Sequence, residues 1–424
     1  MPCNFATAMQ YYKLPPLEFT MSYIRRSLES VVQSAAEQFP VVALTGPRQS
    51  GKTTLLRHLL GDGCGYVSLE TPDTRLAAIT DPRGFLDFHE SPVILDEIQY
   101  APELLMYVKE RVDSRRDVPG QYFITGSQNL LLNQHITESL AGRVAMLTLL
   151  PLSNREIAGE PDAALPWEDG PTRTLTGAGQ ADLWRSFIRG GYPELVAHPA
   201  RNTDLWFASY MQTYLERDVR SLSRIGDLAQ FQTFLRVLAA QSGALLNLNS
   251  MARDLGTSLN TLKNWLSLLE ATYQVFILRP YHANISKRLV KTPKVYFSDV
   301  GLMCRLVGLG DAGHAMNSPM SGAIVETAVI NEIVRTIRHR GAEPRLYFWR
   351  TATGVEVDLL VETEGRIIPV EVKQSATPRP AMAKGIRGFQ ADIGDVAAPG
   401  FVVHTGDVKM PLGDGTLAWP FAGL

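Results

Sequence analysis

The feature that most constrains this 424-residue chain is a glycine-rich stretch, TGPRQSGKTTL, which begins at Thr45. It directly follows the apolar run VVAL and leads into the amphipathic stretch TLLRHLL. A loop of this composition between a buried strand and a helix predicts a phosphate cradle, because glycines let backbone N–H groups close around an anion. An ordinary glycine turn is the alternative. The cradle would comprise Gly46, Pro47, Arg48, Gln49, Ser50, Gly51, Lys52, Thr53 and Thr54.

A second apolar run, PVILDEIQ, ends in two adjacent carboxylates and completes the predicted nucleotide site. Parallel α/β sheets place their ligands at this carboxyl end of the strands. We expect Lys52 to reach the β- and γ-phosphates and the Thr53 hydroxyl to ligate Mg²⁺. Asp96 would hold the Mg²⁺ shell, and Glu97 would orient the attacking water. The pattern therefore predicts ATP and Mg²⁺ as ligands.

Two further polar residues extend this prediction. Ser127 follows the strand QYFITG and would either sense the γ-phosphate or cap a turn. Arg143, in SLAGRV, would either reach the γ-phosphate of a neighbouring subunit as an arginine finger or form a surface ion pair. If Arg143 acts on a neighbour, activity requires a homo-oligomer.

The alternation of short apolar runs with amphipathic stretches predicts an α/β fold with a parallel sheet from Val41 to about Leu152. Further along, three helical stretches and two β-rich pieces follow in the order of a winged helix. We divide the chain into an N-terminal segment (1–39), a P-loop domain (40–158), a linker and helical connector (159–226), a winged helix (227–299) and a C-terminal α/β domain (320–424).

Composition limits the choice of compartment and partner. The net charge is −2, so attraction to nucleic acid would have to come from a local patch. Three isolated cysteines and the lack of a long apolar run predict a cytoplasmic protein with no zinc site and no membrane span. The winged-helix candidate is locally basic, around 287–294, which favours contact with DNA phosphates. Packing between domains is the alternative.

Near the end of the chain, EVDLLVETEGRIIPVEVK predicts a hairpin with Glu364 and Gly365 at its turn. Counting outward, Thr363 pairs with Arg366, Asp358 lies opposite Glu371, and Glu356 lies opposite Lys373. Opposed carboxylates repel each other unless a cation lies between them, and oxygen ligands suit Mg²⁺ or Mn²⁺. A glutamate is unusual at a left-handed turn position, and a three-residue loop would shift this register.

Several segments together resemble a known family. They include GPRQSGKTTL, LDEIQ, ESLAGRV, RGGYPE, TYLERDVR, KVYFSDVGL, EVDLLVE and PVEVK, spread from about residue 40 to residue 375. The chain is similar to prokaryotic AAA-superfamily ATPases whose C-terminal half is the domain of unknown function 4143. The resemblance implies an AAA-type P-loop core, a winged helix and a restriction-endonuclease-like domain. Only the linker 162–180 departs from the pattern, because it is longer and richer in Ala, Pro and Gly.

The hairpin also resembles the PD-(D/E)xK nuclease signature, through Asp358 followed by Glu371 and Lys373. Glu326, on the preceding helix, matches the additional acidic position of that fold. The resemblance implies that Glu326, Asp358 and Glu371 bind a metal. Lys373 would then position or activate water, or stabilise charge that develops on the phosphate. The resulting hypothesis is an ATPase coupled to DNA binding or processing. The alternatives are a nucleotide-dependent DNA-binding regulator with an inactive nuclease-like domain, and a protein-remodelling ATPase.

Overall fold

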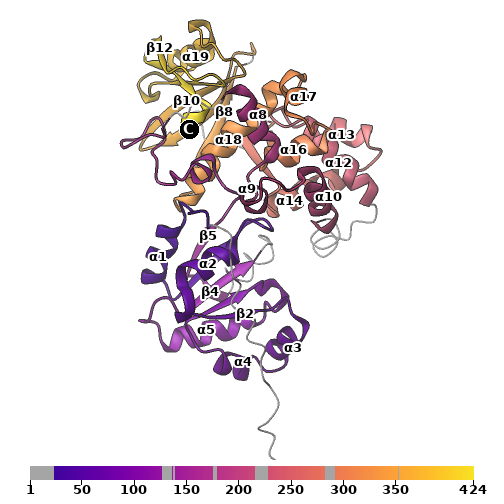
Figure 1. Cartoon of the computed structure of the whole chain (residues 1–424), viewed down its shortest axis with the longest axis vertical. Coiled ribbons are helices and arrows are strands. Elements are labelled where there is room, and N and C mark those ends of the chain that lie inside the picture. Colours follow the sequence, from indigo (N-terminus) through magenta and orange to yellow (C-terminus); the bar gives the residue numbers. More distant parts are fainter. Residues whose placement is uncertain are drawn as a thin grey trace, which may run out of the picture.

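The computed structural model describes residues 23–126, 136, 139–174, 179–214, 228–281, 292–351 and 353–424. These residues form two lobes, a purple N-terminal lobe and a larger lobe coloured from magenta to yellow (Figure 1). The N-terminal lobe is built on a five-stranded sheet of order β2-β3-β4-β1-β5, in which all neighbours are parallel. Its strands are β1 (Val41–Thr45), β2 (Gly65–Ser68), β3 (Val93–Asp96), β4 (Tyr122–Gly126) and β5 (Val144–Thr148).

Helices cover both faces of this sheet, so its central strands are buried throughout. Alternate residues of β1 enter different cores: Val41 and Ala43 enter one, and Val42 and Leu44 enter the other. Burial on both faces explains why these strands are continuous apolar runs, and it confirms the predicted parallel α/β core. The helices are α1 (Glu29–Gln38), α2 (Lys52–Leu60), α3 (Pro72–Thr80), α4 (Pro82–Phe88) and α5 (Leu104–Ser114).

The second lobe combines a mixed eight-stranded sheet, of order β12-β13-β11-β10-β9-β8-β6-β7, with helices from the middle of the chain. Among the described residues, no helix has the length and apolar character needed to cross a bilayer. The strands are β6 (Val275–Pro280), β7 (Lys294–Phe297), β8 (Leu346–Arg350), β9 (Glu356–Thr363), β10 (Arg366–Lys373), β11 (Phe401–His404), β12 (Met410–Gly413) and β13 (Thr416–Pro420). The helices are α7 (Asn154–Ile157), α8 (Gln180–Arg189), α9 (Pro193–Ala197), α10 (Thr203–Tyr214), α12 (Leu228–Ala240), α13 (Leu248–Asp254), α14 (Leu259–Ala271), α16 (Val300–Leu306), α17 (Ala312–Asn317), α18 (Ser321–His339) and α19 (Lys384–Ile393).

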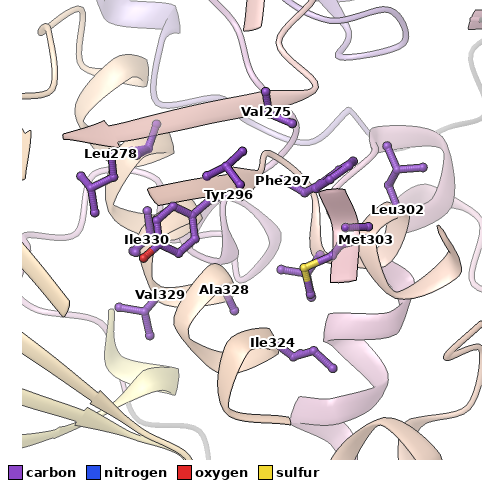
Figure 2. Close-up of a cluster of buried hydrophobic side chains, with 14 of the residues drawn as sticks. Val275, Leu278, Tyr296, Phe297, Leu302, Met303, Ile324, Ala328, Val329 and Ile330 are labelled. Carbon is purple, nitrogen blue, oxygen red and sulfur yellow. The ribbon is translucent and has the colours of Figure 1, made fainter. Parts of the chain in front are cut away.

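Helices α12, α13 and α14 are followed by the antiparallel strands β6 and β7, which is the order predicted for a winged helix. The hairpin does not stand alone, however, because β6 also pairs with β8 of the C-terminal sheet. Its inner side chains pack with α16 and α18 in one core, where Tyr296 lies beside Ile330 (Figure 2). The predicted winged helix and C-terminal domain therefore share one sheet and one core, and the winged helix stays a prediction.

Strands β9 and β10 have the predicted register. Thr363 pairs with Arg366, and the ladder continues to Leu359 opposite Val370, one residue short of Asp358 and Glu371. Both turn residues take left-handed backbone angles, with φ of 48° at Glu364 and 74° at Gly365. A two-residue turn with both φ values positive matches the twist of the flanking strands, so the register follows from local chemistry.

The two lobes meet where the RGGYPE segment enters the C-terminal core. The Gly191 N–H donates to Asp299 Oδ2 at 2.8 Å, and its carbonyl accepts from the Leu152 N–H at 2.7 Å. Arg335, on α18, donates to the Leu152 carbonyl at 2.9 Å. A Cβ on Gly191 would lie 2.6 Å from both Arg335 Nη1 and the Leu152 oxygen, so only glycine fits. This junction places the start of α9, at Pro193, beside the glycine-rich loop.

Candidate nucleotide site and C-terminal carboxylate cluster

The glycine-rich loop joins the end of β1 to the first turn of α2, as the sequence predicts. Gly46 has φ of 142°, and a Cβ there would lie 2.1 Å from the Leu149 oxygen, so a larger residue is excluded. The Lys52 ammonium is buried and donates to the carbonyls of Gly46 at 3.1 Å and Pro47 at 2.8 Å. The lysine thus folds back over the loop, and its charge lies where the phosphates of a bound nucleotide are expected.

Hydroxyl groups from three elements converge on Asp96 at the carboxyl end of β3. The Thr53 hydroxyl donates to Asp96 Oδ1 at 2.7 Å, and the Thr125 hydroxyl donates to the same oxygen. The Tyr66 hydroxyl donates to Oδ2 at 3.0 Å. Burial, and then the nearby Asp96 charge, raises the pKa of Tyr66, so this phenol stays protonated. The structure therefore brings the predicted pair Thr53 and Asp96 together.

Glu97 follows Asp96 in a left-handed backbone conformation, with φ of 58°. Its N–H donates to the Thr125 hydroxyl at 3.1 Å, and its carboxylate accepts from the Gln99 amide. Such backbone angles in non-glycine residues are concentrated at functional sites. Thr125 was missed in the sequence, although a polar residue inside the apolar run QYFITG was the available signal. Ser127, the residue predicted there, lies outside the described residues.

Arg143 lies far from the phosphate loop of its own chain. It immediately precedes β5, whose first residue pairs with Val41 and whose last pairs with Thr45, so Arg143 is at the opposite end of the sheet from the loop. Its guanidinium forms a bidentate ion pair with Asp113, at 2.5 Å from Nε to Oδ1 and 3.0 Å from Nη2 to Oδ2. This contact raises the pKa of Arg143 and lowers that of Asp113. Arg143 therefore forms the surface ion pair that was the alternative to an arginine finger, and a role in a neighbouring subunit stays a prediction.

A cavity of about 560 Å³ opens beside the phosphate loop. Its volume lies in the usual range for small-molecule sites. Tyr23 and His58 stack on one another at its wall, with ring centroids 3.6 Å apart. Residues from four segments line it: Tyr23, Ile24, Arg26, Gln49, Gly51, Thr53, Thr54, Leu55, Arg57, His58, Leu152, Pro193, Glu194 and Ala197. The sequence did not reveal this cavity, because its walls come from segments up to about 170 positions apart.

Arg26 ties the phosphate loop to the second lobe. Its guanidinium donates to the Ser50 carbonyl at 2.9 Å, to the Leu150 carbonyl at 2.7 Å and to Glu156 Oε1 at 3.1 Å. Glu156 is also contacted by His339, at the end of α18, whose Nδ1 lies 3.1 Å from Glu156 Oε1. The Nε2 of His339 accepts the Leu150 N–H. Burial alone would raise the pKa of Glu156, but Arg26 and His339 lower it well below its usual range.

Tyr273 makes a second contact from the larger lobe to the loop. Its hydroxyl lies 2.8 Å from Thr45 Oγ1, and Thr45 directly precedes Gly46. Tyr273 has φ of 58°, a strained conformation for an aromatic residue. Burial raises the pKa of its phenol, which therefore stays protonated. The edge of the phosphate loop is thus held from the other lobe at two places.

The C-terminal carboxylates surround a lysine that was predicted to lie on the surface of the wing. Lys294, counted among the basic residues of the wing, is only 4% exposed and points inward. Its ammonium lies 3.0 Å from Glu326 Oε1 and 2.5 Å from Glu356 Oε1. This corrects the predicted wing surface, because a buried lysine with two carboxylate partners does not contact DNA phosphates. The stretch from 282 to 291 lies outside the described residues.

The predicted metal ligands are held by other partners. Asp358 Oδ2 accepts the Val372 N–H at 2.8 Å, and Glu371 Oε1 accepts from Lys373 at 2.5 Å. Burial, followed by the Asp358 charge, raises the pKa of Glu371 to about 8 and that of Glu326 to about 7. Among the described residues, no group of three or more His, Cys, Asp or Glu side chains has the arrangement of a metal site. Metal binding by Glu326, Asp358 and Glu371 therefore stays a prediction.

Three protein-family models match this chain. Residues 38–158 match the AAA domain family. Residues 180–313 match a domain of unknown function, DUF8612, and residues 321–424 match another, DUF4143. Among solved structures, the Walker-type ATPase PABY2304 of Pyrococcus abyssi is 19% identical and covers 67% of this chain and 96% of its own, with a TM-score of 0.44.

Among curated proteins, an uncharacterized protein of Mycobacterium tuberculosis is 32% identical over 401 residues, which is 93% of this chain and 83% of the relative. An uncharacterized protein of Haemophilus influenzae is 22% identical over 315 residues, which is 68% of this chain and 74% of that protein. The chain therefore belongs to the same family as the mycobacterial protein, and it carries a P-loop AAA domain followed by the C-terminal domain DUF4143.

Proposed function

We propose that this chain hydrolyses ATP in a Mg²⁺-dependent reaction at the glycine-rich loop. The observation that carries the proposal is the hydrogen-bonded set of Thr53, Asp96 and Thr125 at the mouth of the loop. The cavity beside it has room for a nucleoside, and the stacked rings of Tyr23 and His58 offer an aromatic wall for the base. The match to the AAA domain supports the same reaction class.

The residues at this site fit a magnesium ion. Mg²⁺ in nucleotide sites is held by one or two protein oxygens together with substrate phosphates and water. The Thr53 hydroxyl and the Asp96 carboxylate, 2.7 Å apart, provide oxygens of this kind. Thr53 would ligate the ion, and Asp96 would hold its water shell. Bound there, the ion would neutralise charge on the β- and γ-phosphates.

The chain's own groups would perform the remaining work. Lys52 would exchange its two carbonyl partners for phosphate oxygens and stabilise the charge that develops in the transition state. Glu97 would orient the attacking water. The hydrogen bond from its N–H to the Thr125 hydroxyl holds the Glu97 backbone in place next to Asp96. These roles are those predicted from the sequence, with Thr125 added as a positioning residue.

Two variants separate nucleotide binding from turnover. We expect Lys52→Ala to lose binding of a fluorescent ATP analogue and phosphate release together. Glu97→Gln should keep binding and lose turnover by about 100-fold or more. Glu103→Gln, an exposed residue of the same lobe, serves as the matched control and should leave both unchanged. Equal phosphate release by the wild type and Lys52→Ala would overturn the proposal.

We also propose that the larger lobe binds DNA, on the basis of exposed basic residues alone. Within the predicted winged helix, the basic residues Arg236, Arg253, Lys263 and Arg279 are exposed. Exposed cations on the predicted winged helix favour contact with phosphates. If they bind DNA, Lys263→Ala together with Arg279→Ala should flatten the dependence of DNA binding on salt concentration. The control is Arg185→Ala, which removes an exposed arginine of α8 outside the predicted winged helix and should leave this dependence unchanged. An unchanged salt dependence would favour a protein client.

Homo-oligomerisation is the third part of the proposal and depends on Arg143. A neighbour's nucleotide would have to compete with Asp113 for this guanidinium. We expect Arg143→Ala to lower turnover without changing ATP affinity, and mixing it with Glu97→Gln protein should partly restore turnover in shared sites. If turnover per chain does not depend on protein concentration and the mixture shows no rescue, Arg143 has only a structural role.

A further inference from the structure

The side chain of Lys294 is unusual because it combines deep burial with several negative neighbours. Moving an ammonium group away from water is unfavourable unless anions or hydrogen-bond acceptors surround it. Lys294 meets this condition with Glu326 and Glu356, and the Asp358 charge adds to the attraction. Its Nζ also lies 5.5 Å from the centre of the Phe348 ring. The burial and the contacts therefore show a built cation position.

Four carboxylates form this cluster: Asp358, whose Oδ2 accepts the Val372 N–H, and three glutamates with cationic neighbours. Glu326 Oε1 accepts from Lys294 and, at 2.6 Å, from the Tyr296 hydroxyl. Glu356 contacts both Lys294 and Arg350, whose Nη1 lies 3.2 Å from Oε2. Glu371 is held through Oε1 by Lys373, while its buried Oε2 has no hydrogen-bond partner in the structure. The cluster is therefore rich in cations from the chain itself and retains one unused acceptor.

We propose that the Lys294 ammonium is the resident cation of this cluster and that a divalent metal ion and Lys294 are mutually exclusive occupants. Glu326 Oε1 already accepts from two donors, which makes this oxygen less available to a metal ion. Mg²⁺ or Mn²⁺ in this cluster would have to bind to its carboxylates, close to Lys294 Nζ. The positive charge of the ammonium group would repel the metal ion there. In this form the C-terminal domain is a metal-free platform rather than a metal-dependent nuclease.

The contribution of Lys294 can be measured by Mn²⁺ binding to nucleotide-free protein, followed by the electron paramagnetic resonance signal of free Mn²⁺. Wild type should show no binding that depends on Asp358, so wild type and Asp358→Asn should titrate alike. Lys294→Met should gain an Mn²⁺ site, and the gain should vanish in Lys294→Met combined with Asp358→Asn. An Asp96→Asn background removes any contribution from the nucleotide site.

Two results would overturn the proposal. One is Mn²⁺ binding by wild type that Asp358→Asn abolishes, which would mean that the metal displaces Lys294. The other is a folded Lys294→Met protein that gains no site. Because Lys294→Met removes the counter-ion of Glu326 and one of the two counter-ions of Glu356, its thermal midpoint is measured with and without Mn²⁺. We expect Mn²⁺ to raise that midpoint and to leave the midpoint of Lys294→Arg unchanged. The comparison of wild type with Asp358→Asn decides the question even if Lys294→Met does not fold.

Discussion

Glu156 is the residue whose removal should most clearly separate the two lobes. Its carboxylate accepts from Arg26 Nε at 3.1 Å and from the N–H groups of Ser27 and Ser153 at 2.9 Å, and His339 lies beside it. Both Glu156 and His339 are fully buried. Removing one partner of a buried ion pair costs about 3–5 kcal/mol, because the remaining charge stays buried without compensation. We therefore expect Glu156→Ala to lose about that much free energy of unfolding.

The same change should weaken ATP binding through Arg26. Because a trans peptide is planar, the Ser50 carbonyl that points to Arg26 directs the Gly51 N–H the opposite way, and this N–H is one of those expected to close around the phosphates. In Glu156→Ala, Arg26 loses its carboxylate partner and holds the orientation of the Ser50–Gly51 peptide less firmly. We expect the KM for ATP to rise by about tenfold, equivalent to about 1.4 kcal/mol, with a smaller change in kcat.

The assay uses the distribution of tryptophan. The first tryptophan of the sequence is Trp167, so tryptophan fluorescence reports on the larger lobe, whereas circular dichroism reports on both. In the wild type the two signals should change together on urea unfolding, and in Glu156→Ala they should separate. Glu110→Ala is the control, because its exposed pair with Arg83 should contribute within about 1 kcal/mol. Coincident transitions with an unchanged midpoint in Glu156→Ala would refute the reasoning.

Three further predictions concern single residues. Burial lowers the pKa of His339, so the unfolded chain binds a proton at this residue more readily than the folded chain does. The free energy of unfolding should therefore be highest above about pH 6.5 and fall below that pH by up to about 1.4 kcal/mol per pH unit. His339→Gln should flatten this slope in urea titrations at several pH values. Gly46→Ala should abolish ATP binding in an anisotropy assay, since its Cβ would meet the Leu149 oxygen, and retained affinity would contradict this. Thr125→Val should lower kcat by about 10-fold or more with little change in ATP affinity, because Asp96 and Glu97 lose a shared partner; an unchanged kcat would show that the Thr125 hydroxyl has no part in turnover.

Local patterns account for the parts of this protein that were predicted correctly. The phosphate loop depends on glycines at fixed spacing between one strand and one helix, and the β9–β10 register depends on two turn residues. Both are decided by backbone preferences within about ten neighbouring positions, so a sequence is enough to recognise them. The assignment of Lys294 to the wing was wrong for the opposite reason. Its neighbours in the chain are basic, but its neighbours in space are Glu326 and Glu356.

The sequence by itself determined the parallel α/β core, the phosphate loop and the pairing of the C-terminal hairpin, because each follows from short-range periodicity and turn chemistry. Only the tertiary structure decided which distant groups meet. Arg26, Glu156 and His339 come together from three separate segments, and Tyr23 meets the loop and Pro193 around one cavity. Such contacts depend on how the lobes pack, and the burial of charge that they require is compensated only when all partners arrive at the same place.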